Sequence, residues 1–225
     1  MKMNAKSKSY EERLRQFTEE VTVYPVSCER LAAGRTDIEW LEAVLAGGAR
    51  VVQLRDKESD DRKLYEKAVA FRKKTSDAGA LFIVNNRVDV AVLAGADGVH
   101  LGNSDLPAKE VRSFFPDLLI GVSCNVKEQA VTAKERGASY FNIGPLFSTE
   151  TKSGLATFLG ADAISFFSSV SDLPFTVMGG IKLDHVSELV KRGAQRIAVV
   201  TAITQADDIA HETKRWCEAI TNSGL

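Results

Sequence analysis

The stretch GARVVQLRDK, residues 48–57, contains the structural unit that repeats through this chain. A glycine that follows a helix can adopt the left-handed conformation that ends it, so Gly48 predicts a helix end. The apolar, β-branched residues from Val51 onward then predict a short buried strand. The same Gly-Ala pair precedes three further apolar runs, at Gly79-Ala80, Gly137-Ala138 and Gly193-Ala194. The chain therefore repeats a helix, a glycine turn and a strand.

Eight apolar runs are spread along the chain, with helical patterns between them. The predicted strands are Val21–Val26, Arg50–Leu54, Leu81–Val84, Gly98–Leu101, Leu119–Val122, Tyr140–Ile143, Phe175–Met178 and Arg196–Val200. The predicted helices are Asp37–Ala46, Asp60–Ala78, Arg87–Leu93, Ala108–Phe114, Val126–Arg136, Ala161–Val170, Leu183–Arg192 and Asp207–Ala219. The spacing of the strands suits connections through helices and is too long for hairpins.

Eight successive strand–helix units predict an α/β protein with a single closed (β/α)8 barrel, the TIM barrel, over residues 21–225. Residues 1–20 are expected to form an N-terminal extension, with an extra helix over Ser7–Glu20. The alternative is an open, doubly wound sheet. No Gly-x-Gly-x-x-Gly motif follows the first strand, which argues against that alternative.

Composition narrows the class of partner. The 225 residues include 29 Lys and Arg against 30 Asp and Glu, so no overall field attracts nucleic acid or a membrane surface. No apolar run approaches the roughly 20 residues of a membrane span. The three cysteines, Cys28, Cys124 and Cys217, have no paired spacing and are expected to be reduced thiols of a cytoplasmic protein. We expect a small-molecule partner held by local charge; a homo-oligomer is compatible with the sequence.

The end of the second strand gathers polar groups. Side chains alternate along a strand, so Gln53, Arg55 and Lys57 are expected to point one way and Leu54 and Asp56 the other. An amide and two cations then converge where burial without a partner is costly. This arrangement indicates an anionic ligand.

Polar or glycine residues follow the other strands too, and in a (β/α)8 barrel these positions share the catalytic face. They are Asn85 and Asn86, Asp105, Ser123 to Asn125, the loop from Gly144 to Gly154, Gly179-Gly180, and Val200 with Thr201. Two anionic subsites are predicted from them. Arg55, Lys57 and Lys152 would balance a highly charged group, with Asp105 holding a divalent metal against it. Gly180, Val200 and Thr201 would hold a separate monophosphate.

At these residues the sequence resembles the thiamine phosphate synthase family. The matching segments are Gln53 to Lys57, Val84 to Asp89, Ala96 to Gly102, Gly121 to Ser123, Gly144-Pro145 through Thr149 to Lys152, and Gly179 to Ile181. The resemblance implies a transferase that joins 4-amino-5-hydroxymethyl-2-methylpyrimidine diphosphate to 4-methyl-5-(2-phosphoethyl)thiazole. The products are thiamine phosphate and diphosphate, and Mg2+ is the implied cofactor.

The resemblance also implies roles for individual residues. The pyrimidine diphosphate would be held by Gln53, Arg55, Lys57, Asn85, Ser123 and Lys152, with Leu54 and Asp56 in the same segment. The thiazole phosphate would be held by Thr149, Thr151, Gly180, Val200 and Thr201, and Glu150 is a further expected substrate-binding residue. Arg55, Lys57, Ser123 and Lys152 are the expected catalytic residues, and Asp105 and Asn86 the expected metal ligands. The implied mechanism is dissociative, so the protein would stabilise charge that grows on the leaving diphosphate.

The chain departs from the family pattern at three places. Asn86 stands where an aspartate is expected, which predicts weak Mg2+ binding in the absence of diphosphate. Asn103 replaces a common glutamine, and Asn125 stands where the family often has histidine. His100 is expected to be a packed structural residue, and His185 and His211 to lie on outer helices.

Three alternatives remain open. The related thiazole tautomerase branch uses a histidine after the fifth strand, where this chain has Asn125. A phosphate-ligand-binding regulatory barrel that has lost catalysis is a second alternative. An aldolase-like barrel would need Lys57 or Lys152 as a desolvated Schiff-base lysine, yet both lie among groups suited to anions. Residues Ser148–Gly160 are predicted to form a lid that excludes water.

Overall fold

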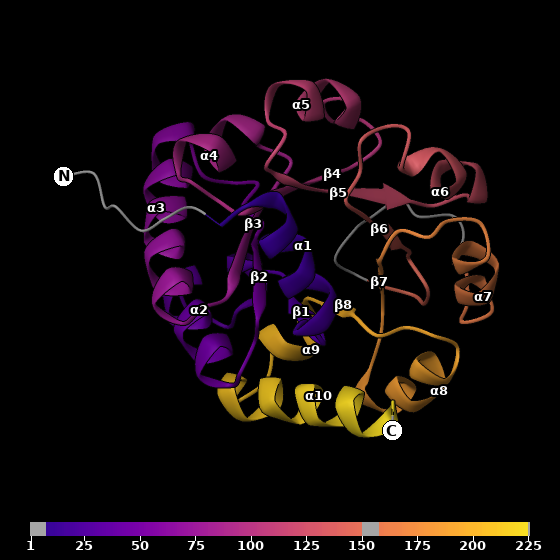
Figure 1. Cartoon of the computed structure of the whole chain (residues 1–225). Coiled ribbons are helices and arrows are strands. Elements are labelled where there is room, and N and C mark those ends of the chain that lie inside the picture. Colours follow the sequence, from indigo (N-terminus) through magenta and orange to yellow (C-terminus); the bar gives the residue numbers. More distant parts are fainter. Residues whose placement is uncertain (1–7, 150–157, 225) are drawn as a thin grey trace.

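Eight parallel strands form a barrel with helices around its outside (Figure 1). This computed structural model describes residues 8–149 and 158–224. The strands are β1 (Val23–Pro25), β2 (Val51–Leu54), β3 (Leu81–Asn85), β4 (Gly98–Leu101), β5 (Leu119–Cys124), β6 (Tyr140–Ile143), β7 (Phe175–Val177) and β8 (Ile197–Val199). Neighbours in the sequence are neighbours in the sheet, and β8 pairs with β1. A bridge between Val26 and Gln53 joins β1 to β2 and closes the ring. The predicted (β/α)8 barrel is confirmed.

The outer helices follow the predicted order. They are α2 (Asp37–Ala46), α3 (Asp61–Asp77), α4 (Val88–Leu93), α5 (Ala108–Phe114), α6 (Lys127–Ala133), α7 (Ala163–Ser168), α8 (Val186–Lys191) and α10 (Ile209–Ser223). Two short 3-10 helices, η1 (Glu29–Leu31) and η2 (Leu183–His185), and the four-residue α9 (Thr201–Thr204) complete the described chain. The sequence predicted neither η1 nor α9, because segments this short carry no helical periodicity.

Each Gly-Ala pair forms the same helix end. Gly48, Gly79, Gly137 and Gly193 have φ of 95°, 67°, 85° and 99°, the left-handed conformation that the pattern predicts. The amide of the following alanine then donates to the carbonyl five residues back, as Ala49 does to Val44 at 3.1 Å and Ala80 to Thr75 at 2.9 Å. This Schellman arrangement satisfies helix-end carbonyls and turns the chain directly into the next strand.

Two hydrophobic cores support the barrel. The larger one lies between the strands and the outer helices and includes Trp40, Leu54 and Trp216. The smaller one fills the barrel interior and includes Phe17, Tyr24, Leu119 and Tyr140. Because side chains alternate along a strand, β6 contributes Phe141 and Ile143 to the larger core and Tyr140 to the smaller one.

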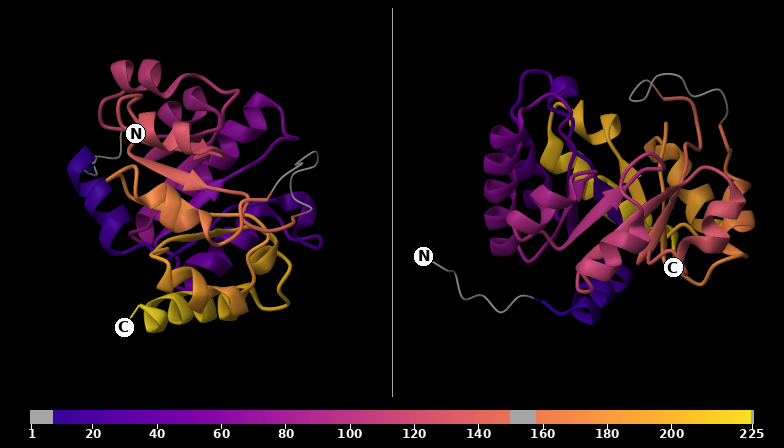
Figure 2. Two further views of the ribbon diagram at one scale, coloured as in Figure 1. Left: turned by 90° about the vertical axis from the view of Figure 1, so that its right-hand side faces the viewer. Right: turned by 90° about the horizontal axis from the view of Figure 1, so that it is seen from above.

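The N-terminal helix α1 (Tyr10–Glu19) closes the end of the barrel where the strands begin. Figure 1 shows it lying across the centre of the ring, and Figure 2 shows it at one end of the barrel. Phe17 is fully buried, and its ring lies 4.4 Å from that of Tyr140 between centroids. Gln16 Nε2 donates to the Gly79 carbonyl at 2.6 Å, and Arg196 donates to the Thr18 carbonyl at 2.9 Å. An extra N-terminal helix was expected; the observed one is shorter than Ser7–Glu20.

No helix in the described part of the chain is both long enough and apolar enough to cross a membrane.

Candidate active site

A cavity of about 480 Å³ opens where the strands end, at the opposite end from α1. Its lining includes most of the residues that the sequence singled out: Gln53, Arg55, Lys57, Asn85, Asn86, Asp105, Ser123, Thr149, Gly180, Val200 and Thr201. The sequence placed these residues at the ends of seven different strands, and closure of the barrel brings them together. Glu150, Thr151 and Lys152 lie outside the described residues, as does most of the predicted lid over 148–160.

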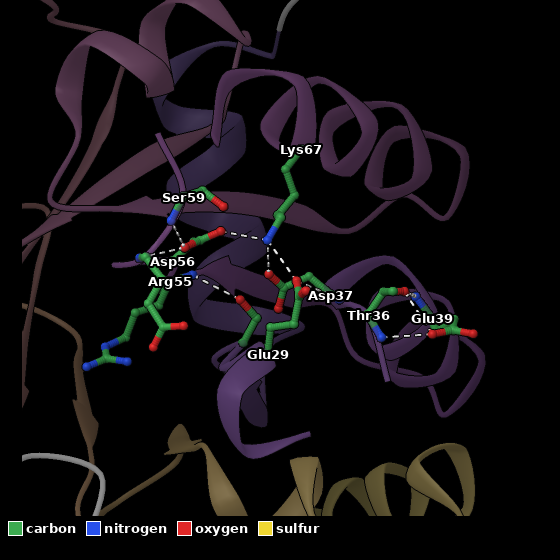
Figure 3. Close-up of polar contacts among 10 residues, drawn as sticks. Glu29, Thr36, Asp37, Glu39, Arg55, Asp56, Ser59 and Lys67 are labelled. Atoms are coloured by element: carbon green, nitrogen blue, oxygen red, sulfur yellow. Dashed lines mark hydrogen bonds and ion pairs between the residues drawn. The ribbon is translucent and has the colours of Figure 1, made fainter. Parts of the chain in front are cut away.

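The side chains at the end of β2 point alternately to the two faces of the strand. Gln53, Arg55 and Lys57 line the cavity. Leu54, only 1% exposed, belongs to the core between strands and helices. Asp56 turns toward α3, where its Oδ2 lies 2.6 Å from Lys67 Nζ (Figure 3). Leu54 and Asp56, which the sequence analysis included among substrate-binding residues, are therefore not brought to the cavity, because they lie on the other face of β2.

Lys67 joins three carboxylates beneath the cavity rim (Figure 3). Its Nζ lies 2.8 Å from Glu29, 2.7 Å from Asp37 and 2.6 Å from Asp56. Burial raises the pKa of Asp37 to about 6, although Lys67 opposes the effect. Burial would also raise the pKa of Asp56, but the hydrogen bonds from Lys67 and from two backbone amides outweigh it, and that pKa is lowered. The cluster fixes the loop after β2 to α2 and α3.

The same loop is anchored from β1. The backbone amide of Arg55 donates to the buried Ser27 hydroxyl at 3.0 Å, and the Ser27 amide donates to the Gln53 carbonyl at 2.9 Å. Asp56 Oδ1 accepts from the amides of Glu58 and Ser59, both at 2.9 Å. The backbone that carries Arg55 and Lys57 is therefore held on both sides before a ligand arrives.

Five polar side chains form a continuous series across the barrel beneath the cavity. Gln53 Nε2 donates to Tyr24 Oη at 2.9 Å, and Tyr24 Oη lies 3.0 Å from Tyr140 Oη. His100 Nδ1 lies 3.4 Å from Tyr140 Oη, and His100 Nε2 lies 3.1 Å from Ser123 Oγ. Burial lowers the pKa of His100 to about 4, so its ring is neutral at physiological pH. The ring is held by hydrogen bonds on both nitrogens, and it also lines the cavity.

The sequence analysis did not identify Tyr24 and Tyr140 as parts of this region. Each occupies a strand two residues before a residue that lines the cavity, Val26 and Asn142 respectively. Residues two apart on a strand point to the same side. Applying the same alternation to the residue two positions before each strand end would have predicted that both tyrosines point into the barrel.

The proposed metal ligands lie on the same side of the cavity. Asp105 Oδ2 accepts from the Gly102 amide at 2.6 Å. Asn86 has a φ of 65°, a conformation that asparagine and aspartate tolerate better than most residues. Within residues 8–149 and 158–224, no three His, Cys, Asp or Glu side chains gather closely enough to hold a metal ion. One carboxylate and an amide oxygen fit Mg2+ when substrate phosphate and water complete its coordination.

The other two departures from the family pattern contact each other. Asn103 Nδ2 donates to Asn125 Oδ1 at 2.8 Å, and Asn125 Nδ2 donates to the Gly144 carbonyl. Both asparagines line the cavity. The amide pair joins the loops after β4, β5 and β6, so Asn125 is a structural link at the place where an acid-base histidine was considered.

The second predicted anion subsite lies around the Gly179-Gly180 pair. A Cβ on Gly180 would lie 2.1 Å from the Ser148 carbonyl oxygen, and one on Gly179 would lie 2.5 Å from Pro145 Cβ. The Phe147 amide donates to the Gly179 carbonyl at 2.9 Å. Glycine is therefore required here because the loop after β6 lies directly against the backbone after β7. Gly180, Val200 and Thr201, which follow the neighbouring strands β7 and β8, all line the cavity.

The fold and this cavity define a (β/α)8-barrel protein with a cavity at the ends of its strands that is lined by cationic and polar side chains. A family model described as thiamine monophosphate synthase matches residues 23–203. The chain belongs to this family.

Individual relatives agree with this assignment. The chain is 37% identical over 215 residues to a thiamine-phosphate synthase of Caldicellulosiruptor saccharolyticus, covering 95% of this chain and 97% of that protein. It is 42% identical over 188 residues to one of Methanoculleus marisnigri, covering 83% and 89%. A solved structure of thiamine phosphate pyrophosphorylase from Pyrococcus furiosus superposes with a TM-score of 0.84 at 31% identity, covering 91% of this chain and 97% of that one.

Proposed function

We propose that this protein is a thiamine phosphate synthase, a transferase acting on two small phosphorylated molecules. It joins 4-amino-5-hydroxymethyl-2-methylpyrimidine diphosphate to 4-methyl-5-(2-phosphoethyl)thiazole and releases diphosphate. The observation that carries the proposal is a single cavity lined both by Arg55 and Lys57, which follow β2, and by Gly180, Val200 and Thr201, which follow β7 and β8. Two anionic groups on two substrates match these two sets of residues.

The leaving diphosphate is assigned to the cations after β2. Departure of diphosphate places negative charge on its oxygens, and positioned Arg55 and Lys57 stabilise that charge as it develops. Gln53, Asn85 and Ser123 face the pyrimidine. Mg2+ held by Asp105 and Asn86 would add positive charge beside the leaving group when bound. Lys152, Thr151 and Glu150, from the loop after β6, are proposed to complete the site.

The thiazole phosphate is assigned to the second of these sets of residues. Backbone amides near Gly180, Val200 and Thr201 suit a monophosphate, and Thr149 lines the cavity beside them. With its phosphate held there, the thiazole nitrogen faces the carbon that diphosphate leaves. Positioning of the two substrates then supplies a large part of the rate enhancement.

The tautomerase alternative lacks its acid-base group in this chain. Asn125 stands at that position, and both ends of its amide are engaged, with Asn103 and with the Gly144 carbonyl. An amide does not transfer protons near neutral pH. The synthase reading is therefore favoured.

The direct test mixes both substrates with the purified protein and Mg2+ and follows thiamine phosphate by chromatography. We expect product that depends on both substrates, and loss of product in the Arg55→Met variant. Arg30→Met, on the exposed η1 helix, is the matched control and should retain activity. Absence of product at every Mg2+ concentration, together with tight binding of thiamine phosphate, would instead establish the binding-barrel alternative.

A further inference from the structure

The hydrogen-bonded series connects Gln53 to Ser123, which line the cavity, through two buried tyrosines that do not and through His100, which also borders the cavity. Gln53 and Ser123 stand at its two ends and line the cavity. Tyr24 and Tyr140, both 1% exposed or less, form its middle and do not reach the cavity. His100 connects Tyr140 to Ser123, at 3.4 Å and 3.1 Å respectively. A change at Tyr24 or Tyr140 can therefore reach the ligand only through the members that line the cavity, Gln53, His100 and Ser123.

Each side chain in the series has few hydrogens to donate. This limit fixes which partner is the donor in each hydrogen bond. A tyrosine hydroxyl carries one hydrogen, and a neutral imidazole has one donor and one acceptor nitrogen. Gln53 donates to Tyr24, so the Tyr24 hydrogen must go to Tyr140 if it is to find an acceptor. The Tyr140 hydrogen then goes to His100 Nδ1, and His100 Nε2–H donates to Ser123. Reversing any one link leaves a buried hydroxyl hydrogen without an acceptor, which is unfavourable because that group has lost its hydrogen bonds to water.

The direction of these hydrogen bonds determines which donor and acceptor groups remain available to a ligand in the cavity. Ser123 Oγ accepts from His100, so its own hydrogen is left for a ligand acceptor. Gln53 gives its Nε2 to Tyr24, and its Oε1 makes no hydrogen bond within the described part of the chain, so the oxygen is left for a ligand donor. We propose that Tyr24, Tyr140 and His100 are positioning residues that fix Gln53 as an acceptor and Ser123 as a donor toward the substrate. This inference rests on the proposed function, in which the ligand is an aminopyrimidine. Its amino group donates hydrogen bonds and its ring nitrogens accept them.

The residues packed around the series leave room for its side chains to meet. A Cβ on Gly121 would lie 2.4 Å from Tyr140 Oη and 2.6 Å from His100 Nδ1, so only glycine leaves room for these two side chains to meet. On the other side, Phe17 of α1 packs on the ring of Tyr140 at 4.4 Å and on that of Tyr24 at 6.3 Å between centroids. The N-terminal helix therefore seals the series from water and takes part in shaping the site at the far end of the barrel.

The test removes one hydroxyl from the middle of the series. Tyr140→Phe keeps the ring and its contact with Phe17 but breaks the links to Tyr24 and His100. We expect KM for the pyrimidine diphosphate to rise about tenfold, the effect of one lost hydrogen bond, and KM for the thiazole phosphate to change less than twofold. Thr75→Val is the matched control, because it removes a buried hydroxyl bonded to the Phe71 carbonyl on α3, away from the cavity. The control should leave both KM values unchanged.

A spectroscopic measurement on the ligand-free protein tests the direction without any assay of activity. We expect ¹⁵N NMR of the wild type to show His100 in the single tautomer with hydrogen on Nε2, and Tyr140→Phe to show both tautomers. If Tyr140→Phe does not fold, Tyr24→Phe cuts the series one link away and carries the same expectation for KM.

Three results would overturn the proposal: hydrogen on Nδ1 in the wild type, an unchanged tautomer in the variant, or equal KM changes for both substrates. If the wild type makes no thiamine phosphate, the proposed function fails while the tautomer measurement still decides the direction of the series.

Discussion

At the scale of single residues, we propose that Asn86 limits how strongly the site holds Mg2+. Its backbone, at φ 65°, is one that aspartate also tolerates, so Asn86→Asp should not strain the chain. We expect the added carboxylate to lower the Mg2+ concentration for half-maximal activity several-fold, because Mg2+ prefers carboxylate ligands. Ser113→Asp, on the outer surface of α5, adds the same charge elsewhere and should have no effect. Identical Mg2+ titrations for wild type and Asn86→Asp would show that Asn86 is not at the metal.

His100 predicts a dependence of stability on pH. Its pKa is about 4 in the folded protein and about 6.5 when unfolded, so between these values only the unfolded chain takes up the proton. Falling pH therefore favours unfolding, and the full effect corresponds to about 3 kcal/mol. We expect the free energy of unfolding of the wild type, relative to that of His100→Asn, to fall by about this amount between pH 7 and pH 4. Urea denaturation at several pH values measures it, and a constant difference would contradict the assignment.

At the scale of elements, the connection from β2 to α3 depends on Lys67. Lys67→Met would leave Glu29, Asp37 and Asp56 close together without their cation, and breaking a buried ion pair in this way costs about 3 kcal/mol or more. We expect that loss in urea denaturation, together with a higher KM for the diphosphate substrate.

Lys74→Met is the control for this change. Lys74 lies on the same helix and pairs with Glu42 at the surface, where such a pair is worth about 0–1 kcal/mol. Equal losses for the two variants would mean that the cluster around Lys67 has no special role.

Local patterns predicted the elements well, and the reasons are physical. The apolar runs and the glycine after each helix act within a few residues, so strands such as Gly98–Leu101 and Tyr140–Ile143 have their predicted bounds. Alternation also predicted that Gln53, Arg55 and Lys57 share a face. The pairing of Tyr24 with Tyr140, 116 residues apart, could not be predicted in the same way, because it depends on how the closed barrel aligns its strands. The contact between Asn103 and Asn125 has the same origin.

At the scale of the whole molecule, α1 is part of the barrel rather than an appendage. Phe17→Ala should cost about 3–5 kcal/mol, because it opens a cavity in the interior core against Tyr24 and Tyr140. Phe114→Ala, at a side chain that is 76% exposed on α5, should change stability little. Thermal and urea unfolding measure both. A loss below 1 kcal/mol for Phe17→Ala would show that the helix does not seal the barrel.

The glycine turns described above all lie at the end of the barrel opposite the cavity. Each reverses the chain in the same few residues and with the same hydrogen bonds, so this end has little freedom to vary in length. The connections at the other end are held by contacts of individual side chains, such as those of Lys67 and Asn125. For protein engineering, the scaffold thus separates a fixed half from an exchangeable half, and loops grafted after the strands could alter substrate range while the turns before them keep the barrel intact.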